Sequence, residues 1–156
     1  MYHSTGDQLV ATVWISNKYK ELTDRLSSGL FPTNMHFMIF ASMVGLYFDN
    51  VKEVTAKERG NEIRDQVFLN QRMDGVVYLL ALFKDKTADI LRDENEQACW
   101  EVIETYAAGG FEIINNWLIE NPADIDGTET ILNKIKEIAS TQKEQDLTQD
   151  YTDLDF

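Results

Sequence analysis

The 156-residue chain is poor in the residues that hold metals, form disulfides or act as general bases. Its one cysteine, Cys99, excludes a disulfide within the chain and indicates a reducing compartment. The two histidines, His3 and His36, lie far apart, whereas a zinc site needs about four cysteine, histidine or carboxylate ligands. We expect His36, in the first turn of an apolar helix, to be a core or capping residue.

Long apolar runs are also missing. The most apolar stretch, residues 35–48, contains polar residues and is too short to cross a membrane. The N-terminus, MYHSTGDQ, has neither the basic nor the apolar region of a signal peptide. These absences predict a cytoplasmic protein that makes no membrane contact.

The sequence contains no catalytic motif that we can identify. No phosphate-binding glycine loop follows an expected strand, and neither Gly-x-Ser-x-Gly nor Glu-x-x-His occurs. Glu101 and Glu104 are spaced to share a cation on a helix, but a solvated face is the simpler interpretation because no histidine supports them. Cys99 lies on an apolar stripe and is expected to serve packing. We therefore predict no enzymatic activity, no catalytic or metal-binding residue and no cofactor.

Acidic residues, in contrast, are abundant. The chain has 27 Asp and Glu against 14 Lys and Arg, a net charge of −13. Residues 1–84 hold nine of each sign, so residues 85–156 carry the whole excess. Direct nucleic-acid binding is not expected, because a phosphate backbone is held by lysine and arginine. The acidic half serves either solubility or contact with a basic protein surface, where it can compete with nucleic acid.

Apolar spacing predicts a mainly α fold, a compact bundle of about six helices with at most a short β element near the N-terminus. Residues 7–16 alternate loosely and allow a short strand, whereas the polar residues 49–64 are expected to form a loop with at most one helical turn. Residues 64–71 fit either an extended segment or a short helix. Helices are expected between Ser16 and Gly29 and over residues 34–48, 73–83, 98–108, 111–118 and 130–139. The helix that starts near Thr33 is apolar on nearly every face and is expected at the buried centre of the domain. In the last helix, the spacing of Ile131, Leu132, Ile135 and Ile138 predicts that these residues face inward.

Two adjacent glycines, Gly109 and Gly110, interrupt the stretch ETYAAGGFEIINNWL. Apolar residues occur at helical spacing on both sides of the pair, and glycine adopts a left-handed conformation without steric cost. We therefore expect a tight corner between two packed helices, built by Glu104, Tyr106, Gly109 and Gly110. Gly45, inside the apolar helix over residues 34–48, is instead expected to allow close approach of a neighbouring element.

The composition changes after Ser140. We therefore divide the chain into a single helical domain, residues 1–140, and an acidic, flexible C-terminal tail, residues 141–156. The tail is either a frayed terminus or a peptide that orders on a partner. The candidate partner-binding residues in the tail are Tyr151, Leu154 and Phe156. Trp117 of the helical domain is a further candidate, because tryptophan is common at interfaces.

The order of the segments resembles a known family. A tyrosine-rich first helix precedes FPTNMHFMIFASMVGLYF, EIRDQVFLNQRMDGVVYLLAL and ETYAAGGFEIINNWL. This order is similar to that of the small accessory proteins associated with bacterial DNA-phosphorothioation (Dnd) systems. The resemblance covers about residues 14–120, with the matching steps at residues 41–45, 63–68 and 104–110. It implies an accessory protein of anti-phage machinery that works through protein contacts, and it identifies no chemical step.

Two non-enzymatic functions follow, and the first is favoured because the neutral half supplies most of the core and no site chemistry is visible. An enzyme, such as a nuclease or a metal-dependent hydrolase, is a third hypothesis. The first is a non-enzymatic interaction subunit of a bacterial anti-phage defence system, bound to a larger protein component of that system. The second is an acidic inhibitor or regulator that mimics nucleic acid and occupies the basic groove of a DNA-binding protein. Binding of the second kind weakens steeply with salt. Self-association into a homo-oligomer is compatible with either function.

Overall fold

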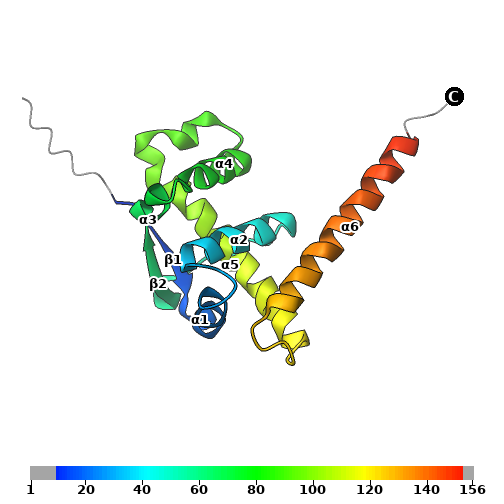
Figure 1. The fold of residues 1–156 in the computed structure, drawn as a ribbon. Coiled ribbons are helices and arrows are strands. Elements are labelled where there is room, and N and C mark those ends of the chain that lie inside the picture. The colour runs from blue at the N-terminus through cyan, green and yellow to red at the C-terminus, as the bar shows by residue number, and fades with distance from the viewer. Residues whose placement is uncertain (1–9, 153–156) are drawn as a thin grey trace, which may run out of the picture.

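The computed structural model describes residues 10–152 and the side chains of residues 10–146 (Figure 1). This part of the chain is mainly α, as predicted, with six α-helices and one two-stranded antiparallel sheet. The strands are β1 (Thr12–Ser16) and β2 (Arg59–Arg64). The helices are α1 (Lys20–Ser27), α2 (Asn34–Tyr47), α3 (Asp65–Asn70), α4 (Asp74–Asp85), α5 (Glu96–Glu120) and α6 (Thr128–Thr152).

Helices α2 and α5 cross at the centre of the molecule, so closely that only glycine fits at the contact (Figure 1). A Cβ atom added to Gly110 would lie 1.7 Å from the carbonyl oxygen of Ala41. One added to Gly45 would lie 2.0 Å from the carbonyl oxygen of Tyr106. Glycine is the residue that permits such backbone approach. The predicted role of Gly45 is therefore confirmed.

The predicted corner at Gly109 and Gly110 is wrong. Helix α5 is one uninterrupted helix of 25 residues, and both glycines lie inside it. Among the residues that the structure describes, Gly127 is the glycine with a positive φ, so neither member of the pair supplies a left-handed turn. Gly109 faces the loop after α2, where an added Cβ would lie 1.7 Å from the carbonyl oxygen of Asn50. The pair permits backbone contact along one side of a continuous helix.

Aromatic side chains fill the core on both sides of this crossing. Phe37 of α2 meets Phe111 of α5 edge to face, with ring centroids 4.9 Å apart, and Tyr19 packs on the same ring at 5.8 Å. Nearer the start of α5, Trp100 meets Phe68 of α3 at 5.0 Å. Such pairs contribute about 0.5–1.5 kcal/mol each beyond the burial of their area. They hold α2, α3 and the segment before α1 against the single long helix α5.

The small sheet packs against α5. Strand β1 agrees with the sequence prediction. Strand β2 lies in the segment that was predicted to be a loop; it gave no strand signal because only Ile63 of its six residues is buried. Val13 pairs with Ile63 in the antiparallel register. The Glu104 carboxylate accepts a 2.7 Å hydrogen bond from the Trp14 N–H and so covers the unpaired edge of β1. Glu104 and Tyr106 are thus buried residues within α5 and belong to no corner.

Helix α2 begins where the sequence predicts. Its N-cap is Thr33, whose hydroxyl oxygen accepts a 3.4 Å hydrogen bond from the His36 N–H and lies 2.8 Å from Nδ1 of the same histidine. His36 is therefore a capping residue, one of its two predicted roles. Of the two alternatives for residues 64–71, the structure has the short helix, α3. No helix within residues 10–152 is both long and apolar enough to cross a membrane.

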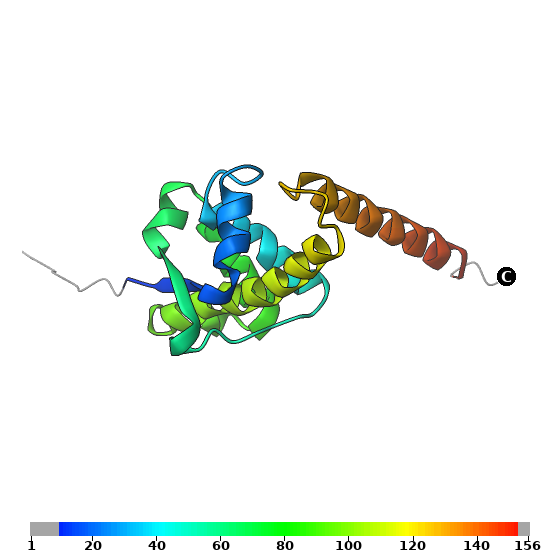
Figure 2. The same ribbon diagram turned by 90° about the horizontal axis from the view of Figure 1, so that it is seen from below.

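Helix α6 projects from the rest of the molecule. Its first turns lie beside the end of α5, and its remaining turns extend away from the body in both views (Figures 1 and 2). It starts at Thr128, close to the predicted start, and continues to Thr152. The change of composition after Ser140 therefore does not end the helix. Between α6 and α2 the fold leaves an open angle, which contains the candidate site.

Candidate partner-binding groove

Helix α2 has no charged residue, and the core covers only part of its apolar surface. The face toward α5 is buried. On the other face Met43 is 39% exposed and Tyr47 is 43% exposed, with Phe40, one turn earlier, partly buried. Phe48, which follows the helix, is 46% exposed and packs its ring against Trp117 of α5 at 6.2 Å. A contiguous exposed apolar face of this kind marks an interaction surface more often than a scattered single residue does.

The turn between α5 and α6 holds α6 at a defined angle. Arg25 of α1 donates hydrogen bonds from its guanidinium group to the backbone carbonyls of Asp124 and Ile125. The Asp124 carboxylate accepts hydrogen bonds from the Thr130 N–H at 2.7 Å and from the Thr130 hydroxyl at 2.6 Å. These bonds from Thr130 lower the pKa of Asp124. The carboxylate therefore satisfies the first turn of α6, where N–H groups have no partner within the helix.

Packing reinforces this attachment. Gly127, at φ +76°, allows the chain to turn directly into α6, and an added Cβ would lie 2.9 Å from a methyl carbon of Leu118 and 3.0 Å from one of Leu26. Ile131, in the first turn of α6, is 2% exposed. The base of α6 is thus fixed to α1 and α5 by hydrogen bonds and by burial, while its last turns extend away from the body (Figure 1).

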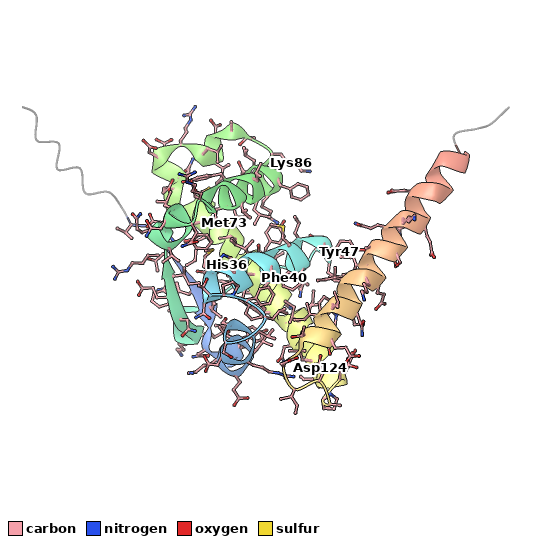
Figure 3. The ribbon with its side chains drawn as sticks, in the orientation of Figure 1. His36, Phe40, Tyr47, Met73, Lys86 and Asp124 are labelled. Atoms are coloured by element: carbon pink, nitrogen blue, oxygen red, sulfur yellow. The ribbon has the colours of Figure 1, made fainter. Side chains whose placement is uncertain are left out.

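Two apolar hollows lie between α6 and the body. The first, about 240 Å³, is lined by Leu30, Phe31, Phe40, Thr128, Ile131, Leu132 and Ile135. The second, about 270 Å³, is lined by Phe40, Met43, Val44, Tyr47, Trp117, Ile135, Ile138, Ala139 and Gln142. Phe40 and Ile135 line both, so the two form one continuous groove, which we call the α2–α6 groove. Figure 3 shows Phe40 and Tyr47 on the side of α2 that faces α6.

The lining of the α2–α6 groove is mostly apolar. Among the side chains that the structure describes, no charged one lines either hollow, and the polar groups are those of Thr128, Gln142 and the Tyr47 hydroxyl. Leu132 and Ile135 of α6 are 48% and 43% exposed. The groove therefore offers mainly apolar contact area to an occupant.

Groups with perturbed acidity lie elsewhere and have structural explanations. Burial raises the pKa of the Cys99 thiol to about 11, so it is protonated at neutral pH. Burial also raises the pKa of Glu104, with nearby Glu101 adding to the effect and the Trp14 N–H opposing it. Within the part of the chain whose side chains are described, no group of three or more His, Cys, Asp or Glu residues could hold a metal ion.

The four predicted partner-binding residues do not lie together in one described site. Trp117 is 8% exposed and lines the groove at the end nearer Tyr47. Tyr151 belongs to the last turn of α6, beyond the described side chains. Leu154 and Phe156 lie outside the described residues. The groove thus includes one of the four predicted residues.

Sequence reasoning missed the remaining groove residues. It placed α2 at the centre of the domain because the helix is apolar on nearly every side, and it directed Leu132 and Ile135 inward with Ile131. Two patterns in the sequence indicate that α2 and α6 carry apolar surface that the core does not cover. A 14-residue helix without a single charge has more apolar surface than one neighbour can cover. The last helix also has two adjacent apolar positions, Ile131 and Leu132, of which only one faces the core.

The chain matches the family model described as DNA sulphur modification system-associated protein 4 over residues 14–150. No curated protein and no solved structure gives a significant match. The matched range includes α2, α5 and most of α6, so both walls of the groove lie within it. It also extends past residue 120, where the resemblance in the sequence ended. The chain therefore belongs to the family of DNA sulphur modification system-associated protein 4, the Dnd-associated accessory family that the order of its segments indicated.

Proposed function

We propose that this protein is a non-enzymatic accessory subunit of a bacterial DNA sulphur modification system with an anti-phage role. In this proposal it binds a larger protein component of that system in the α2–α6 groove. The observation that carries the proposal is the groove itself, an open, uncharged, apolar channel between two anchored helices. Membership of the family links the chain to the system.

A protein partner suits this surface better than nucleic acid does. The described residues that line the groove include no lysine or arginine to replace the counterions of a phosphate backbone, and the chain carries a net charge of −13. Interfaces between proteins are instead centred on buried apolar and aromatic anchors. Phe40, Tyr47 and Trp117 provide such side chains on one wall, and Ile135 provides an aliphatic one on the other.

The proposal is tested by co-purification of the tagged protein with the co-expressed components of the DNA sulphur modification system. We compare the wild type with Ile135→Asp, in the groove, and with Leu79→Asp, on the outer face of α4. Ile135 is 43% exposed and Leu79 is 68% exposed, so neither change buries a charge in the core. We expect the wild type and Leu79→Asp to retain a component of the system and Ile135→Asp to lose it.

Other outcomes separate the alternatives. Retention of the component by Ile135→Asp would show that the partner binds elsewhere. Recovery of no component with the wild type would overturn the proposed function. Capture of assorted DNA-binding proteins that is indifferent to Ile135→Asp and disappears at high salt would favour the acidic mimic of nucleic acid.

A further inference from the structure

We propose that the occupant of the α2–α6 groove is an amphipathic α-helix of the partner, which inserts an apolar stripe between α2 and α6 and turns a basic face to solvent. This inference rests on the proposed function, because it specifies the partner segment that the accessory subunit binds. Three observations support it: the scarcity of polar groups in the groove, the length of the groove, and the distribution of charge.

The scarcity of polar groups selects a helix. An extended segment entering the groove would bring a row of backbone N–H and C=O groups to a surface on which Thr128, Gln142 and the Tyr47 hydroxyl are the main polar groups. Apart from Leu30 and Phe31 of the loop before α2, the lining residues lie on helices whose backbone groups are paired internally, so the groove offers no sheet edge for strand addition. Unpaired backbone groups in an apolar site are costly. A helix satisfies its backbone groups internally and needs only apolar side chains on one face.

The dimensions of the groove fit the same occupant. Its lining on α6 extends from Thr128 to Gln142, which corresponds to about 21 Å of helix at about 1.5 Å per residue. A partner helix of about four turns can lie along this length. The hollows of about 240 and 270 Å³ accept side chains rather than a whole helix. The expected anchors are therefore apolar residues at three- and four-residue spacing on the partner helix.

Charge favours a basic partner over a second copy of this chain. Residues 117–146, which run from the end of α5 through the turn and along α6, hold seven Asp and Glu against three Lys, a net charge of −4. Two exposed acidic residues also lie at the ends of helices that line the groove: Asp49 comes shortly after α2, and Glu120 is the last residue of α5. Such a field attracts a cationic helix and repels an identical acidic chain.

The sequence of α6 argues against self-pairing for a second reason. Its apolar seam, Ile131, Ile135 and Ile138, is followed at the same spacing by Gln142 and Gln145. Two copies of α6 could form a stable coiled coil only if this seam remained apolar over several heptads. The seam is apolar only where α6 faces the body, which suits a groove wall.

The test introduces a photo-crosslinking phenylalanine derivative at Ile135, and at Leu79 as the matched control. Each variant is co-expressed with the components of the system, and the crosslinked segment is identified by mass spectrometry. We expect crosslinking from position 135 to one segment with apolar residues at helical spacing and lysine or arginine on the opposite face. That segment, made as a peptide, should gain helical circular dichroism on binding and bind Ile135→Asp at least tenfold more weakly than wild type.

Each contrary result has a distinct meaning. A crosslinked segment that is extended, rich in proline or acidic overturns the helix while leaving the proposed function intact. A crosslink to a second copy of this chain also overturns it and identifies the groove as a dimer interface. A component that co-purifies with the wild type but crosslinks only from position 79 overturns the groove as the site. Recovery of no component with the wild type overturns the proposed function itself.

Discussion

The two faces of helix α2 differ in what they contact. Toward α5, its backbone meets another backbone through Gly45 and Gly110, and no side chain separates them. Toward α6, the same helix presents Phe40, Met43 and Tyr47 to an open groove. Both faces are apolar in composition, so hydrophobicity alone does not distinguish them. The comparison shows that glycine placement and the angle of a neighbouring helix determine which apolar face becomes core and which remains available.

The closed face should be the most sensitive to substitution. Replacing Gly110 by valine places a Cβ about where the carbonyl oxygen of Ala41 lies, and neither backbone can move without separating α2 from α5. We expect loss of most of the folding free energy, several kcal/mol, because overpacking at a backbone contact has no flexible side chain to absorb it. Urea unfolding followed by circular dichroism measures this effect.

Gly75 is the matched control, since an added Cβ there meets no atom within 4 Å. Gly75→Ala should be neutral or stabilise by up to about 1 kcal/mol. A Gly110→Val protein as stable as the wild type would show that the crossing of α2 and α5 is looser than described.

Two methionines of α2 lie on its opposite faces. Met38 is fully buried, whereas Met43 is 39% exposed in the groove. Met38→Ala should destabilise by about 2–5 kcal/mol through the cavity that it leaves. Met43→Ala should change stability by less than about 1 kcal/mol and should weaken binding of the partner. Urea unfolding and co-purification distinguish the two effects, and equal loss of stability in both variants would contradict the assignment of an open face.

Substitution of Glu104 tests whether its hydrogen bond to the Trp14 N–H stabilises the edge of β1. The contribution of Glu104 to stability also depends on pH. Burial raises the pKa of Glu104 in the folded state above its unfolded value. The folded protein therefore binds this proton more tightly, and this group's contribution to stability falls as pH rises from the unfolded pKa through the folded one.

Glu104→Gln retains an acceptor for the Trp14 N–H and removes the buried charge, so the fall in stability above the unfolded pKa should lessen. Glu104→Ala should cost about 1–3 kcal/mol, because the Trp14 N–H loses its partner. Urea unfolding from pH 4 to 8 measures both variants. A pH profile of Glu104→Gln identical to that of the wild type would remove Glu104 as its source.

Asp124 should give the smallest effect, at the base of the groove. Hydrogen bonds from Thr130 lower the pKa of Asp124 in the folded state. Its contribution to stability is therefore present above the unfolded pKa and is lost as pH falls through the folded pKa. Asp124→Ala should loosen the first turn of α6, which amide hydrogen exchange of residues 128–131 can detect. Unchanged exchange in this turn would show that Arg25 and Ile131 suffice to hold α6.

Much of the helical fold could be predicted from local pattern. Thr33 before an apolar run predicted the start of α2, and the spacing of Ile131, Ile135 and Ile138 predicted the last helix. Strand β2 escaped prediction because it is polar and owes its conformation to pairing with β1. Residues Gly109 and Gly110 were misassigned because glycine pairs serve turns and close contacts alike, and the distinction depends on a partner that lies far away in the sequence.

The groove was the least predictable feature. Its residues come from α2, α5, α6 and the loop before α2, and no local pattern indicates that α6 projects from the body. That angle follows from contacts between distant segments, namely Arg25 with the carbonyls of residues 124 and 125, and Gly127 against Leu26 and Leu118. Trp117 could be identified as an interface candidate from its residue type alone, because tryptophan is enriched at interfaces.

Periodicity, charge and segment order are properties of the chain, and they sufficed to predict that this protein is helical and acidic and to indicate its family. Which apolar surface stays open depends instead on how the helices pack. The helices α2 and α6 both contain more apolar side chains than the core can cover, and the excess becomes a groove only where the anchored turn at residues 121–127 holds the two helices apart. Burial is a relation between distant segments, so residue type alone cannot specify it.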